Sequence, residues 1–199
     1  MLKIVLATSN PHKVEEINAI IKETAVDLGV EFILPPKGFD PIEDADTFEG
    51  NALLKAKEAN KITGMPTLAD DSGLCVDALD GEPGIHSARY ADTPIARIEK
   101  LLGALKDVAD ENRGAKFVCA MVLLDEKGEV LFSDRGECLG KIGREVKGQN
   151  GFGYDPIFVV GNGDLTMSEL SEEEKNRISH RGLALQKVIK YLQTSKKYF

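Results

Sequence analysis

A short apolar segment, followed by a polar loop and a helical pattern, constrains the fold of this chain most. Residues 3–7 are β-branched or apolar, which predicts a buried strand. Beyond the loop at 8–13, one face of a helix is marked by Val14, Ile17, Ile20 and Ile21. Open α/β sheets are built from such strand–loop–helix units, and they bind ligands at the loop. The N-terminal segment therefore predicts an α/β fold.

The loop at 8–13 has the chemistry to hold a phosphate group. Free backbone amides and a partial positive charge at a helix N-terminus attract anions. Hydrogen-bond donors and a positive charge are added by Thr8, Ser9, Asn10 and Lys13. The loop is not a Walker loop, because GxxxxGK[ST] is absent. Taken alone, an ordinary capped helix start explains these residues equally well.

Further strands and helices are expected along the rest of the chain. Helices are predicted at 47–63, 93–105 and 183–192. Asp46 is expected to cap the first of these with Glu49 three residues on, and a capping box of Ser171 and Glu174 is expected to open a further, charged helix. Strands are predicted at 31–34, 74–79, 116–124, 129–135, 137–142 and 157–160. The later strands favour an antiparallel or mixed sheet. We predict a single domain over 1–199 with two lobes, whose boundary lies near the polar segment 107–115.

Two adjacent carboxylates, Asp70 and Asp71, stand before Ser72 and Gly73. Neighbours on a strand point to opposite faces, so at a strand end or bend one carboxylate can be buried in hydrogen bonds while the other faces a metal. Magnesium takes one or two carboxylates plus water and substrate phosphates, and it lowers the pKa of bound water. The simpler alternative is an acidic turn with solvated carboxylates, and for a lone Asp-Asp pair we favour it.

Two further polar segments are candidates for ligand binding. In the glycine-rich loop at 148–156, Phe152 can stack on a nucleotide base, which contributes roughly 1–3 kcal/mol, or it can fill the core with Tyr154. The break at 179–182 places His180 beside Arg181, a fixed fork of donors suited to a carbonyl or phosphate. A serine nucleophile is not indicated, because no GxSxG elbow is present.

Composition excludes several classes of protein. The net charge of −8 argues against a general nucleic-acid surface, which needs a basic face. Cys75, Cys119 and Cys138 are far apart and odd in number, which argues against a disulfide framework or a zinc site and for core positions. The first residues show no basic region followed by a long apolar stretch, and no apolar segment reaches membrane-spanning length, so we expect a cytoplasmic protein.

Five segments together resemble the inosine triphosphate pyrophosphatases, or non-canonical purine NTP pyrophosphatases. They are TSNPHK at 8–13, NALLKA at 51–56, ADDSGL at 69–74, GFGYDPIF at 151–158 and SELSEEEKNRISHRG at 168–182. The resemblance implies an elongated two-lobed α/β fold, with a central mixed sheet flanked by helices and a substrate cleft between the lobes. It also implies a homodimer and magnesium-dependent hydrolysis of ITP, dITP and XTP to the monophosphate and pyrophosphate, which clears them from the nucleotide pool.

The resemblance also implies roles for individual residues. Asp71 would be the general base and, with Glu43, a metal ligand. Substrate would be bound by Thr8, Ser9, Asn10, Pro11, His12, Lys13, Lys55, Ser72, Phe152, Gly153, Tyr154, Asp155, Lys175, His180 and Arg181. From the helix pattern alone, Lys55 is an ordinary surface lysine. One departure stands out: family members often carry Glu directly before the Asn of NALLKA, and here that position is Gly50.

Two alternative functions stay open. A Maf-like pyrophosphatase would prefer pyrimidine or modified nucleotides. A regulatory module would bind a nucleotide without turnover, but the intact acidic pair, Lys13 and Arg181 speak against a decayed site.

Overall fold

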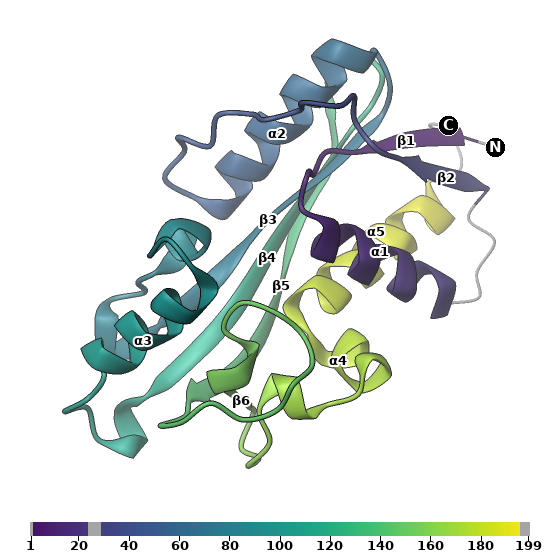
Figure 1. Cartoon of the computed structure of the whole chain (residues 1–199). Coiled ribbons are helices and arrows are strands. Elements are labelled where there is room, and N and C mark those ends of the chain that lie inside the picture. The colour runs from purple at the N-terminus through teal and green to yellow at the C-terminus, as the bar shows by residue number, and fades with distance from the viewer. Residues whose placement is uncertain (1, 24–28, 196–199) are drawn as a thin grey trace. The chain divides into compact units, whose positions relative to one another are not determined.

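The computed structural model describes residues 2–23 and 29–195 as an α/β protein (Figure 1). The strands are β1 (Leu2–Leu6), β2 (Val30–Ile33), β3 (Thr67–Val76), β4 (Gly114–Leu124), β5 (Val130–Ile142) and β6 (Phe158–Val160). The α-helices are α1 (Pro11–Glu23), α2 (Phe48–Thr63), α3 (Pro94–Ala104), α4 (Glu172–Ile178) and α5 (His180–Thr194). The six strands form one sheet in the order β2-β1-β3-β4-β5-β6. Since β1 pairs in parallel with β2 and β3, and β5 pairs antiparallel with β6, the predicted mixed sheet is confirmed.

The chain divides into two compact units. Unit 1 comprises Met1–Asp71, Cys119–Gly136 and Arg181–Phe199, and unit 2 comprises Ser72–Val118 and Glu137–His180. The strands β3, β4 and β5 each contribute residues to both units. The single domain with a lobe boundary near 107–115 stays a prediction.

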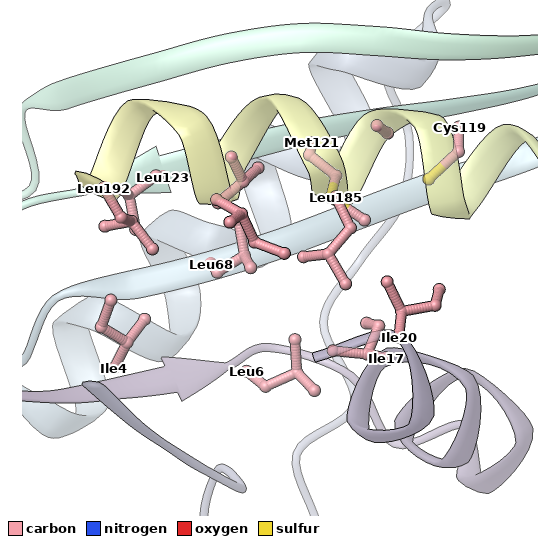
Figure 2. Close-up of a cluster of buried hydrophobic side chains, with 13 residues drawn as sticks. Ile4, Leu6, Ile17, Ile20, Leu68, Cys119, Met121, Leu123, Leu185 and Leu192 are labelled. Carbon is pink, nitrogen blue, oxygen red and sulfur yellow. The ribbon is translucent and has the colours of Figure 1, made fainter. Parts of the chain in front are cut away.

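Strand residues in unit 1 alternate between two apolar layers. Ile4 and Leu6 of β1 and Leu68 of β3 pack with α1 and α5, as Figure 2 shows for one of these layers. The intervening residues Val5 and Ala69 pack instead with α2. Because successive strand residues point to opposite faces, α1 and α5 cover one face of the unit 1 sheet and α2 covers the other. This alternation continues along β3 to Asp70 and Asp71 and decides which helices each carboxylate meets.

Unit 2 has its own apolar core, which supports the glycine-rich loop. Leu74 of β3, Leu101 of α3, Phe117 of β4 and Phe158 of β6 belong to it. The rings of Phe117 and Phe158 are tilted, with centroids 4.6 Å apart. Tyr154 of the glycine-rich loop is buried in the same cluster.

Two strand predictions were wrong for the same reason. The predicted break around Asp70 and Asp71 is absent, because β3 runs through both carboxylates and buries them. The predicted strands at 129–135 and 137–142 are one strand, β5. In both strands, a charged residue at or near the predicted break pairs with a residue distant in the sequence: Asp70 with Lys13, and Asp134 with Lys187.

Most helix ends follow the sequence closely. The exception is α5, which begins at His180, so the predicted break at 179–182 is reduced to Ser179 between α4 and α5. α2 begins after Thr47, whose side chain accepts from the Gly50 amide, so the expected cap at Asp46 was wrong by one residue. The predicted capping box of Ser171 and Glu174 at α4 is confirmed. Among the described residues, no helix has the length and apolar character needed to cross a membrane. No disulfide joins the three cysteines, all of which lie among the described residues. Cys119 and Cys138 lie in the cores as expected, whereas Cys75 is only half-buried.

Candidate active site

On the α1/α5 side of β3, Asp70 holds two positive charges. Its side chain is buried, at 1% exposure, and its Oδ2 lies 2.8 Å from Lys13 Nζ and 3.5 Å from an Arg181 guanidinium nitrogen. Arg181 also pairs with Glu16 of α1. Burial raises the pKa of Asp70, but Lys13, Arg181 and Lys55 outweigh it and hold that pKa well below its usual range. Asp70 is therefore ionised and fixes Lys13 and Arg181 in place.

On the α2 side, Asp71 shares one ammonium group with Glu43. Lys55 Nζ lies 3.3 Å from Asp71 Oδ1 and 2.7 Å from Glu43 Oε1. Burial raises the pKa of Asp71, Lys55 and Lys13 lower it, and Glu43 and Asp70 raise it again, so the net shift is upward. A carboxylate whose pKa is raised accepts a proton more readily, as a general base must.

Lys55 is not the surface lysine that the helix pattern suggested. It is 6% exposed, whereas Lys57 on the same helix is exposed. Burial lowers the pKa of Lys55, but the carboxylates Asp70, Asp71 and Glu43 more than offset this and raise it above its ordinary value. Lys55 is therefore charged and lies between the two predicted metal ligands.

The two carboxylates fit a magnesium ion in number and kind. Glu43 and Asp71 already converge on one cation, the Lys55 ammonium. Magnesium is usually held by one or two carboxylates, with substrate phosphates and water completing the shell. Residues 2–23 and 29–195 contain no group of three or more His, Cys, Asp or Glu side chains arranged to hold a metal by themselves.

The loop between β1 and α1 is a helix cap. Thr8 Oγ1 accepts from the Asn10 amide at 3.2 Å, and Asn10 Oδ1 accepts from the His12 amide at 3.0 Å. Ser9, Pro11 and His12 are exposed. The capped helix start is thus present, and phosphate binding by this loop stays a prediction.

In unit 2, Asp155 organises the glycine-rich loop. Its Oδ2 accepts from the Phe152 amide at 2.9 Å and from Lys175 Nζ at 2.8 Å. A side chain at Gly151 would collide with this carboxylate, and Gly151 also has a φ of 75°, so glycine is required there. Lys175 Nζ lies 4.9 Å from the centroid of the half-buried Phe152 ring. The structure therefore brings together three predicted substrate-binding residues.

Other predicted substrate residues are engaged in their own units. Tyr154 donates from its hydroxyl to the Ser87 carbonyl at 3.0 Å, and burial raises the pKa of Tyr154 to about 12. The ring of His180 stacks on Phe117, with centroids 4.8 Å apart. Arg181 is only 1% exposed beside Asp70. Substrate contacts by these residues, and by the half-buried Ser72 and Gly153, stay predictions.

The departure at Gly50 has a steric cause. A Cβ at this position would lie 2.7 Å from the Cβ of Ala45. The neighbouring Glu49 pairs with Arg135 at 2.7 Å. Of the acidic residues in this segment, Glu43 is the one that shares Lys55 with Asp71.

Sequence reasoning overlooked two residues that contact this cluster. Asn51 donates to Asp71 Oδ2 at 3.2 Å, and Glu16 pairs with Arg181. Asn51 stands four residues before Lys55, and Glu16 stands three after Lys13. Residues at these spacings share one helix face, so the signal was present in the sequence.

Known proteins with closely similar sequences and structures identify the family. The Ham1 family profile matches residues 4–191. A dITP/XTP pyrophosphatase from Shigella flexneri is 45% identical over 198 residues, which cover 97% of this chain and 99% of that protein. One from Haemophilus ducreyi is 47% identical over 192 residues, which cover 92% of this chain and 94% of that protein. The structure of a HAM1 protein from Coxiella burnetii has a TM-score of 0.87 and 42% identity, and covers 98% of this chain and 100% of that one. The chain belongs to the Ham1 family.

Proposed function

We propose that this protein is a magnesium-dependent pyrophosphatase that hydrolyses dITP, XTP and ITP to the monophosphate and pyrophosphate, clearing them from the nucleotide pool. The observation that carries the proposal is the convergence of Asp71 and Glu43 on the Lys55 ammonium. This cluster contains the residue types that the reaction needs: a carboxylate to act as general base, two carboxylates to bind a metal and a cation to bind phosphate. The dITP/XTP pyrophosphatases from Shigella flexneri and Haemophilus ducreyi, similar over nearly the whole chain, support the substrate class.

The reaction follows from the charges of this cluster. Asp71 accepts a proton from the attacking water, and the new P–O bond forms as the bond to the pyrophosphate leaving group breaks. Lys13 and Lys55 neutralise phosphate charge, which a protein with a net charge of −8 must do locally. Magnesium held by Asp71 and Glu43 would stabilise the developing charge on the phosphates and lower the pKa of bound water.

We propose that Phe152, Lys175 and Arg181 select the base. Phe152 would stack on the purine, and Lys175 and Arg181 would donate to the 6-keto oxygen that hypoxanthine and xanthine carry. Adenine has an amino donor at that position, which would leave these donors without an acceptor. Unpaired buried donors can reject a substrate by several orders of magnitude. We also propose that the protein is a cytoplasmic homodimer.

The test is pyrophosphate release from a panel of nucleoside triphosphates, with and without magnesium. We expect strong release from dITP, XTP and ITP and little from ATP. Activity mainly on pyrimidine or modified nucleotides would indicate a Maf-like enzyme instead. Tight nucleotide binding without any product would indicate a regulatory module.

Asp71→Asn tests the assignment of the base. We expect turnover to fall by about 10²-fold or more, with the melting temperature of the folded protein retained. Asp134→Asn is the matched control, because Asp134 pairs with Lys187 on the surface of unit 1. Normal turnover in Asp71→Asn would remove Asp71 from the role.

A further inference from the structure

One buried amide joins Asp71 to the segment that carries Glu43. Asn51 of α2 has no exposed surface. Its Nδ2 donates to Asp71 Oδ2 at 3.2 Å, and its Oδ1 accepts from the backbone amide of Ala45 at 3.0 Å. The two ends of one side chain therefore hold two different parts of unit 1.

The partners fix the orientation of this amide. A carboxylate only accepts hydrogen bonds and a backbone N–H only donates them, so oxygen must face Ala45 and nitrogen must face Asp71. An aspartate at position 51 would keep the acceptor for Ala45 but would face Asp71 with a like charge. A leucine would have a similar volume and make neither bond. Among these three, only asparagine serves both partners.

The two hydrogen bonds of Asn51 restrain both predicted metal ligands, Asp71 directly and Glu43 through the backbone. Ala45 follows Glu43 by two residues, so anchoring the Ala45 amide also restrains the chain that presents Glu43. Lys55, one helical turn beyond Asn51, contacts both carboxylates from the same helix face. Asn51 holds the backbone of the acidic segment, and Lys55 holds the carboxylates themselves.

We propose that Asn51 is a positioning residue that sets the separation of Glu43 and Asp71 for metal binding and turnover. This inference rests on the proposed function of the Asp71 cluster. It assigns to Asn51 no contact with substrate. Its role is to orient the Asp71 carboxylate by one bond and the Glu43 segment by the other.

The experiment compares Asn51→Leu and Asn51→Asp with the wild type. In Asn51→Leu we expect kcat for dITP to fall by about 10-fold to 100-fold, because misplaced reacting groups cost this much. The magnesium concentration for half-maximal activity should rise, while KM for dITP changes little. In metal-free protein, NMR should show the Ala45 amide exchanging with solvent about five-fold faster, since one hydrogen bond is lost.

Asn51→Asp separates the two bonds. It keeps the acceptor for Ala45, so exchange of that amide should stay at the wild-type rate. Its turnover should nevertheless fall as in Asn51→Leu, because the donor to Asp71 is gone. Should Asn51→Leu fail to fold, Asn51→Asp carries the test alone through kcat.

Asn60→Leu is the matched control for lost stability. Asn60 lies on the same helix and is also buried, but its amide donates to the Met65 and Asp125 carbonyls, away from Asp71. It should lower the melting temperature while leaving kcat, magnesium dependence and Ala45 exchange unchanged. Wild-type kcat and magnesium dependence in Asn51→Leu, or equal effects in Asn60→Leu, would overturn the proposal. Asp71→Asn is assayed in parallel. If Asp71→Asn is inactive while Asn51→Leu is normal, only the positioning role of Asn51 is wrong. If Asp71→Asn is active, the proposed function of the Asp71 cluster is wrong.

Discussion

Asp70 and Asp71 show how much one step along a strand changes a residue. Both are aspartates of β3, and both are buried. Asp70 points toward α1 and α5, where Lys13 and Arg181 hold its pKa below the usual range. Asp71 points toward α2, where burial outweighs Lys55 and its pKa is raised. The strand period thus gives two identical side chains opposite electrostatic surroundings, one that holds a carboxylate ionised between cations and one that raises the pKa of a carboxylate.

The lowered pKa of Asp70 predicts how stability depends on pH. The ionised form is favoured by folding, so its contribution is complete above the ordinary pKa of about 3.9 and is lost as pH falls toward the lower, folded pKa. Asp70→Asn removes this contribution and leaves Lys13 and Arg181 with less negative charge. At pH 7 we expect a loss of about 3–5 kcal/mol, as for a broken buried ion pair.

The measurement is urea unfolding in metal-free buffer between pH 6 and pH 3 for both proteins. Between about pH 4 and pH 3, the wild type should lose stability more steeply than Asp70→Asn, because only the wild type must protonate Asp70. Other carboxylates with lowered pKa values, such as Asp134, are common to both and cancel in the difference. Parallel curves would show that Asp70 carries no linked proton.

Removing the charge of Lys55 should change how much magnesium stabilises the protein. Lys55→Met keeps a long, unbranched side chain but leaves Glu43 and Asp71 without their shared cation. We expect the metal-free variant to lose about 3–5 kcal/mol of stability. Magnesium should then raise its melting temperature more than it raises that of the wild type, because a bound cation stabilises the folded state. Lys57→Met, exposed on the same helix, should stay within about 0.5 kcal/mol of the wild type; equal magnesium shifts in all three proteins would contradict the prediction.

At the scale of elements, the sequence predicted those features that depend on residues close together in the chain. The apolar periodicity located α1 and α2, and the cap of α4 was evident in Ser171 and Glu174. The continuity of β3 and β5 was not predictable, because charged residues that suggest turns are buried or paired by residues distant in sequence. For the same reason the sequence placed Lys55 on the surface, while its carboxylate partners keep it buried.

At Gly50, in the first turn of α2, helix propensity favours alanine but the space around the residue does not. Ala favours a helix over Gly by about 1 kcal/mol. In Gly50→Ala, however, the new methyl group would lie 2.7 Å from the Cβ of Ala45 and 3.0 Å from Thr47 Oγ1. We expect a net loss of about 1–3 kcal/mol from overpacking, measured by urea unfolding. Gly103→Ala in α3 has no atom within 4 Å of its new Cβ, so it should gain about 0.5–1 kcal/mol; a stabilised Gly50→Ala would contradict the close approach of Ala45.

At the scale of the whole molecule, the connectivity of the chain links the two units. Unit 1 is built from three chain segments and unit 2 from two. Each of β3, β4 and β5 passes from one unit into the other, so neither unit corresponds to a continuous piece of chain. Unfolding one unit would free the ends of three strands in the other. We therefore expect the two units to unfold together.

The absence of tryptophan makes this cooperativity measurable. Tyr191→Trp places a reporter in unit 1, where Tyr191 packs beside Phe132 with ring centroids 5.4 Å apart. In this background, Leu101→Ala removes a fully buried side chain from the core of unit 2 and should cost about 2–5 kcal/mol. If the units unfold as one, the fluorescence midpoint in urea moves by the same free energy as the midpoint by circular dichroism, although the reporter and the substitution lie in different units. A fluorescence transition that Leu101→Ala leaves unmoved would mean that unit 1 unfolds on its own, despite the three strands that it shares with unit 2.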